Sequence, residues 1–117
     1  MYARMVTSYV RHHQLDAMTA VYRRKLLPMI ENQPGFKGIF VFNDPDCCKE
    51  VSITLWERLV DMEAFNVNLL ALKEEIVPLL ETAPEVEIFQ VVVPEDFNAL
   101  HPPLSESSLG IRIGESF

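Results

Sequence analysis

Hydrophobic positions along the 117-residue chain change period several times, and the changes divide it into six segments. Two stretches, residues 15–32 and 59–81, carry apolar residues at steps of three and four and predict helices. Four stretches rich in β-branched and aromatic residues predict strands: residues 2–10, 36–44, 51–57 and 85–93. The order β-α-β-β-α-β predicts an α+β, ferredoxin-like sandwich in which one antiparallel sheet carries both helices on one face.

Each predicted helix contains residues that disfavour a regular helix. Pro28 is expected to kink or tighten the end of the first helix. In the second, the sequence FNVN at residues 65–68 has poor helix propensity and Pro78 lies near the end. A break in the second helix is therefore expected.

The third predicted strand contains the only tryptophan of the chain, Trp56. Alternation along VSITLWE places two hydroxyl residues, Ser52 and Thr54, on the same face as the indole. A large aromatic ring gains a few kcal/mol by leaving water, and its N–H requires an acceptor. Two interpretations remain open: Trp56 lines a ligand pocket, or it closes a subunit interface.

The sheet face opposite the helices would carry large apolar groups, because the second and fourth strands are bulky at nearly every position. We therefore expect a homodimer in which two sheets pack face to face. The predicted domain spans residues 1–94. Residues 95–117 form a tail of mixed composition, with GIRI as a candidate short strand, and are a candidate for crossing to the partner subunit.

Composition restricts the partners and the compartment. A formal net charge of -7 disfavours nucleic acid, and no apolar run approaches the roughly 18 residues that span a bilayer. Because the N-terminus lacks a signal-peptide pattern, a cytoplasmic location is expected. The adjacent Cys47 and Cys48 are expected to be free thiols. No metal site and no nucleotide motif is expected, because the cysteines lack nearby ligands and the four glycines form no G-x-G.

Two stretches resemble a known family. LLPMIENQPGFKGIFVFNDPD leads from a helix end through a Pro-Gly-Phe turn into a strand, and LWERLVDMEAF joins a Trp-Glu pair to the second helix. Over residues 2–93 the sequence resembles the antibiotic biosynthesis monooxygenase family. That resemblance implies ferredoxin-like subunits that pair as a dimeric α/β barrel. It also implies an oxygenase that uses no cofactor and acts on an aromatic or quinol-like metabolite.

The resemblance also allows the haem-degrading branch of the family to be compared. Where that branch has an asparagine late in the first strand, this chain has Thr7 and Ser8. Residues 59–81 contain no histidine to ligate haem, and Phe65 stands where the branch has a helix tryptophan. Trp56 corresponds to the strand-end tryptophan of the wider family. Haem degradation is therefore disfavoured.

An oxygenase without a cofactor must exclude water and stabilise the deprotonated form of an electron-rich ring. The candidate ligand-binding residues are Trp56, Thr7, Thr54, Tyr22 and Phe65. Weaker catalytic candidates are Tyr9 and the pair His12 and His13, whose imidazoles suit a general base, although solvated loop residues are the preferred interpretation of the pair. The alternative function is a module of the same fold that binds a small ligand or a protein without catalysis.

Overall fold

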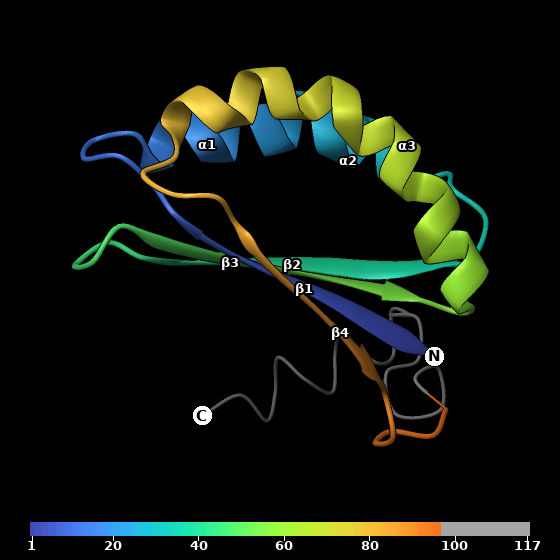
Figure 1. Cartoon of the computed structure of the whole chain (residues 1–117). Helices are drawn as coiled ribbons and strands as arrows, with labels where there is room; N and C mark the ends of the chain where they lie inside the picture. The colour runs from blue at the N-terminus through green and yellow to red at the C-terminus, as the bar shows by residue number, and fades with distance from the viewer. Residues whose placement is uncertain (97–117) are drawn as a thin grey trace, which may run out of the picture.

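The computed structural model describes residues 1–96 and consists of one sheet under a layer of helices (Figure 1). The predicted tail, including GIRI, lies almost wholly outside the described residues. The elements in chain order are β1 (Tyr2–Tyr9), α1 (Leu15–Val21), η1 (Tyr22–Leu26), α2 (Leu27–Ile30), β2 (Phe36–Asp44), β3 (Lys49–Trp56), α3 (Leu59–Ile76), η2 (Val77–Leu79) and β4 (Glu85–Gln90).

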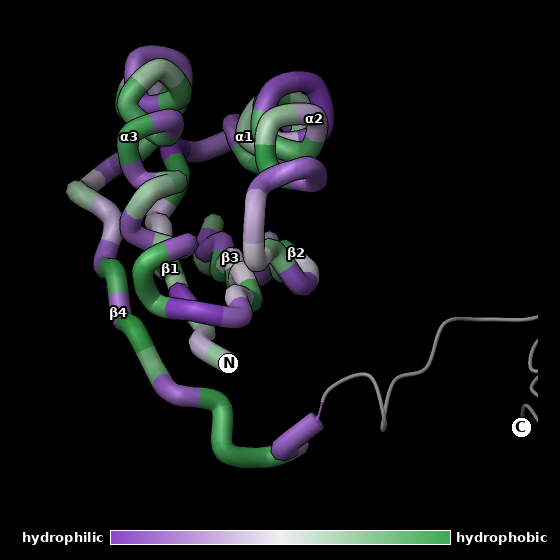
Figure 2. Tube along the Cα trace, turned by 90° about the vertical axis from the view of Figure 1, so that its right-hand side faces the viewer, coloured by the Kyte–Doolittle hydropathy of each residue, from purple (hydrophilic) through white to green (hydrophobic). Residues whose placement is uncertain are grey.

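The strands form a single antiparallel sheet in the order β2-β3-β1-β4. All helical segments lie on one side of it, α1 and α2 beside α3, as the two views show (Figures 1 and 2). The predicted ferredoxin-like α+β fold is thus confirmed. The last strand is shorter than predicted, although the Val91 N–H still donates to the Met1 carbonyl at 2.9 Å.

The first helical region widens where we predicted a kink or a tighter turn. Residues 22–26 form a π turn, in which the N–H of Leu27 donates to the carbonyl of Tyr22. Pro28 explains this, because it has no N–H to donate to the carbonyl four residues earlier and its ring crowds that carbonyl. The wider turn carries two core residues, Tyr22 and Leu26, which are both buried.

The second helical region is more regular than its sequence suggests. α3 runs without interruption through residues 65–68, so the expected break there is wrong. Phe65 is only 3% exposed, and packing of this ring outweighs the weak propensity of its neighbours. Pro78 does end the α-helix, in the short 3₁₀ segment η2.

The sheet face away from the helices is exposed and apolar. The rings of Phe40 and Phe42 on β2 stack with centroids 6.1 Å apart, and about half of each side chain is exposed. Register places Tyr9 of β1 and Phe89 of β4 on this same face, and both are also exposed. We call the face defined by these four aromatic residues the outer face.

The short loops of the domain are polar. Cys47 and Cys48 lie in the turn between β2 and β3 and carry free thiols. No helix within residues 1–96 is long and apolar enough to cross a membrane.

A close approach of two loops fixes the start of α3 against the start of β2. Gly35 has a φ of 76° and accepts a hydrogen bond from the Glu57 N–H at 2.7 Å. Asp61, in the first turn of α3, holds Arg58 with two hydrogen bonds of 2.9 and 3.0 Å. A side chain at position 35 would collide with this carboxylate, because its Cβ would lie 2.6 Å from Asp61 Cγ.

We predict that Gly35→Ala lowers the free energy of unfolding by about 1–3 kcal/mol, through left-handed backbone strain and the collision with Asp61. Gly38→Ala is the matched control, since a Cβ there meets nothing within 4 Å. Urea denaturation of both variants measures the difference. Equal loss in the two variants would contradict this account of Gly35.

Candidate ligand cavity

A cavity of about 650 Å³ lies between the sheet and the helices. Apolar side chains from the helices wall it, among them Leu26, Ile30 and Leu72. The exposed members of its lining come mainly from α3, the segment after it and β4, for example Asn66, Lys73 and Val86. The cavity therefore opens between α3 and β4.

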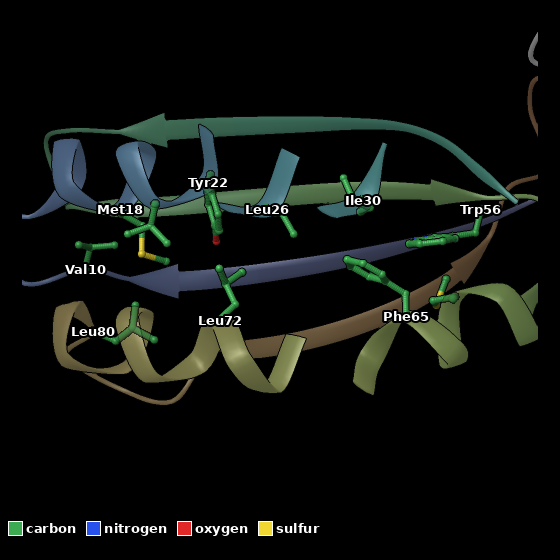
Figure 3. Packing of buried hydrophobic residues seen from close by; sticks show 11 residues of the cluster. Val10, Met18, Tyr22, Leu26, Ile30, Trp56, Phe65, Leu72 and Leu80 are labelled. Atoms are coloured by element: carbon green, nitrogen blue, oxygen red, sulfur yellow. The ribbon is translucent and has the colours of Figure 1, made fainter. Parts of the chain in front are cut away.

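Trp56 lies on the sheet face that the helices cover. It is 1% exposed, lines the cavity and lies beside Phe65 (Figure 3). Its ring contacts the rings of Phe36 and Phe65 at centroid distances of 5.6 and 5.4 Å. Its Nε1 donates to Thr54 Oγ1 at 2.9 Å. Thr54, two residues earlier on the same strand, thus supplies the acceptor that the indole N–H requires. The residues of β3 that alternate with these two point to the outer face.

Polar side chains of two central strands form the floor of the cavity. Register pairs Arg4 with Thr54 and Val6 with Ser52 across β1 and β3, and all four line the cavity. Burial lowers the pKa of the Arg4 guanidinium, against a smaller opposing effect of Tyr22. The floor therefore presents a positive charge and two hydroxyl groups to whatever occupies the space.

Tyr22 joins this floor to a buried acid that the sequence analysis missed. Its ring reaches inward from η1 toward Leu72 of α3 (Figure 3). Burial first, and then Glu50, raise the pKa of the Tyr22 phenol well above its usual value, while Ser52 and Arg4 lower it. The phenol is therefore neutral and available as a hydrogen-bond donor.

Glu50 is 1% exposed and lies on β3 between Ser8 and Asn43 of the neighbouring strands. Burial raises its pKa to about 7, partly opposed by the hydrogen bond from Tyr22. The Asn43 side-chain amide is oriented so that both its oxygen and its nitrogen have suitable partners, and in that orientation its nitrogen donates to Glu50 Oε2 at 2.9 Å. Among the described residues, Oε1 has no short hydrogen bond. Alternation on β3, which puts position 50 on the Trp56 face, was the signal that could have identified this acid.

The remaining predicted site residues lie elsewhere. Thr7 and Tyr9 point to the outer face of β1, because they alternate with the cavity residues Val6 and Ser8. Thr7 is buried there and does not line the cavity. His12 and His13 are exposed in the turn after β1, with ring centroids 3.7 Å apart, and neither lines the cavity. Of the five candidate ligand contacts, the cavity brings together Trp56, Thr54, Tyr22 and Phe65.

Within residues 1–96, no three or more His, Cys, Asp or Glu side chains gather in a way that could hold a metal ion.

We predict that Glu50→Gln stabilises the protein at pH 8 by up to about 3 kcal/mol, with little effect at pH 5. Between pH 4.5 and about 7 the folded state holds a proton on Glu50 that the unfolded state has lost, so wild-type stability falls as pH rises through this window. Denaturant unfolding at both pH values measures the change. The control is Glu63→Gln, at an exposed position of α3. Its effect on the free energy of unfolding should be the same at pH 5 and at pH 8. A Glu50→Gln effect equal at pH 5 and pH 8 would contradict the prediction.

Comparison with known proteins yields no match to a family model and none to a curated protein. Solved structures do match. A protein named "Putative antibiotic biosynthesis monooxygenase" from Nitrosomonas europaea superposes with a TM-score of 0.72 at 15% identity, covering 81% of this chain and 93% of that one.

Two further solved structures extend the comparison. A mutant of SnoaB, a cofactor-independent oxygenase from Streptomyces nogalater, gives a TM-score of 0.66 at 18% identity, over 80% of this chain and 98% of that one. An uncharacterised NIPSNAP domain protein from Burkholderia xenovorans gives a TM-score of 0.62 at 17% identity, over 82% of this chain and 99% of that one. At these identities the likeness is one of fold, and this chain has the fold of structures that include named antibiotic biosynthesis monooxygenases.

Proposed function

We propose that the protein is a member of the antibiotic biosynthesis monooxygenase family. In this proposal it oxidises an aromatic or quinol-like metabolite with molecular oxygen and without a cofactor. The observation that carries the proposal is the cavity itself, which combines apolar walls from the helices with a polar floor from the sheet. Such a combination is typical of sites that hold a flat apolar ligand and fix its orientation with a few polar groups.

Each requirement of that chemistry has a counterpart in the cavity. Trp56 and Phe65 offer aromatic surface for a planar ring at one end. Arg4 stands on the floor, where a positive charge favours the ionised form of a bound hydroxyarene. The deprotonated ligand then passes an electron to oxygen itself, and the walls keep water from the reacting centre. The likeness in fold to a structure named as a cofactor-independent oxygenase supports this choice of reaction.

We also propose that the protein is a homodimer joined through the outer face. Exposed aromatic side chains cover that face, and an apolar patch of this kind favours association. Two copies packed sheet to sheet would cover the face and leave both cavities beneath their own helices.

Titration with a panel of quinols and hydroxyarenes, followed by Trp56 emission, tests the proposed function. We expect saturable quenching by one compound class, and oxygen uptake with that same class. Quenching without oxygen uptake would favour the alternative of a ligand-binding module, and absence of quenching by every compound would contradict a ligand at Trp56.

A cavity-filling variant makes this test specific. Val6→Phe places a ring into the cavity from its floor and should weaken binding at least about tenfold. Val60→Phe makes the same chemical change at an exposed position of α3 that does not line the cavity, and should leave binding unchanged.

We predict that the wild-type protein is a dimer at micromolar concentration and that Phe40→Asp combined with Phe42→Asp converts it to a monomer, because carboxylates would be buried without partners. Light scattering coupled to size exclusion measures the mass. Val67→Asp, at a 69% exposed position on α3, is the control and should remain dimeric. A wild-type monomer would refute the proposed assembly.

A further inference from the structure

Arg4 has an unusual environment for a charged side chain. It lies in the middle of β1, opposite Thr54 on one side and Ile88 on the other, and points under the helices. The ion pairs of the domain join other residues, and no carboxylate within residues 1–96 pairs with Arg4. A partly buried guanidinium without a counter-ion is costly, and an anion in the cavity would remove that cost.

The side chains near Arg4 carry hydroxyl and carboxyl groups that can exchange protons. Tyr22 lines the cavity and interacts with Arg4, with the hydroxyl of Ser52 and with the carboxyl of Glu50. Glu50 does not line the cavity, so Tyr22 stands between the acid and any ligand. The Glu50 carboxylate interacts with Tyr22, and its buried Oε1 has no short hydrogen bond from a described residue, so the ionised acid is incompletely stabilised.

We infer that Arg4, Tyr22 and Glu50 form a deprotonation site, and that the ligand of this cavity is an acidic hydroxyarene that binds as its anion. This inference rests on the proposed function and names the ligand class and the residues that would ionise it. The ligand hydroxyl gives its proton to Tyr22 Oη while Tyr22 gives its own proton to the Glu50 carboxylate. The result is a neutral tyrosine, a neutral glutamic acid and a ligand oxyanion beside Arg4, and no oxidant or reductant is consumed.

The direction of transfer follows from the surroundings of each group. Ionised Glu50 has only neutral partners, whereas the ligand oxyanion has a guanidinium. Moving the negative charge from the acid to the ligand therefore brings it closer to positive charge. The other charged groups of the lining, Arg11, Lys73 and Glu81, are exposed at the mouth, and Arg11 and Glu81 approach each other to 4.0 Å. They are screened by solvent and act on the floor only weakly.

Two aromatic probes, one that cannot ionise and one that can, separate this inference from the proposed function. Naphthalene tests whether the cavity takes an aromatic ring, through quenching of Trp56. The chromogenic phenol 4-nitrophenol tests ionisation, because its anion absorbs at longer wavelength than its neutral form. We expect both to bind the wild-type protein, and the pKa of bound 4-nitrophenol to lie at least about one unit below its value in water.

Three variants assign the effect to its residues. Arg4→Met keeps an unbranched side chain, removes the charge, and should weaken anion binding at least about tenfold while naphthalene affinity stays within about twofold. Tyr22→Phe removes one oxygen and should return the bound 4-nitrophenol toward its pKa in water. Glu50→Gln acts through Tyr22, so its effect is a changed pH profile of the anion band, and naphthalene binding should be unaltered.

The outcomes are distinct. If naphthalene binds but bound 4-nitrophenol titrates as in water, or if Arg4→Met and Tyr22→Phe leave its titration unchanged, the deprotonation site is refuted and the cavity remains a ligand site. If neither probe binds, the proposed function fails and the deprotonation site fails with it. Circular dichroism of each variant confirms the fold, and Tyr22→Phe, which removes only a hydroxyl, keeps the test decisive if Arg4→Met does not fold.

Discussion

The arrangement of this protein depends on which face of the sheet the helices cover. On β3 the covered face carries Ser52, Thr54 and Trp56, while the more apolar alternating residues point outward. A tightly packed core would bring apolar helix side chains directly onto this row and strip its polar groups of partners, at a cost of about 1–3 kcal/mol for each unpaired group. The helices instead span the row and meet the sheet closely at its end, where Trp56, Met62 and Phe65 are almost fully buried. The cavity is the consequence of placing a polar floor beneath an apolar roof.

Much of the fold could be predicted because periodicity and turn residues report local structure directly. The six main elements, their order and the antiparallel sheet all follow from hydrophobic spacing between clear turn signals. The detailed errors have local causes too. Pro28 removed a donor and widened the turn before it, and burial of Phe65 stabilised a stretch of poor propensity. The sequence alone does not say whether local propensity or packing determines the structure at these positions, because that depends on what each residue packs against.

The candidate site was less predictable, because alternation defines two faces of a strand without saying which one is covered. Trp56 and Thr54 were identified because an indole beside a hydroxyl indicates a partly polar environment. Thr7 was named as a candidate contact without a strand face being assigned to it, and it lies on the outer face, one position away from the cavity residues Val6 and Ser8. Glu50 was missed because an acid beside a turn is ordinarily solvated, whereas here it is buried and interacts with Tyr22 from a distant helical turn. Only the packing of η1 over β3 reveals that pair.

The separation of Arg4 from Glu50 is the feature that most needs a functional explanation. The two charges lie on the same covered side of the sheet, yet they do not pair, and Tyr22 interacts with both. A direct ion pair would have compensated each charge, whereas the observed arrangement leaves the acid with a raised pKa and the guanidinium with a lowered one. Folding alone gives no reason to keep two poorly compensated groups beside a cavity, since apolar residues of similar volume would be at least as stable. The proposed ligand would supply the reason, because its anion would compensate the Arg4 guanidinium and its proton would neutralise Glu50 through Tyr22.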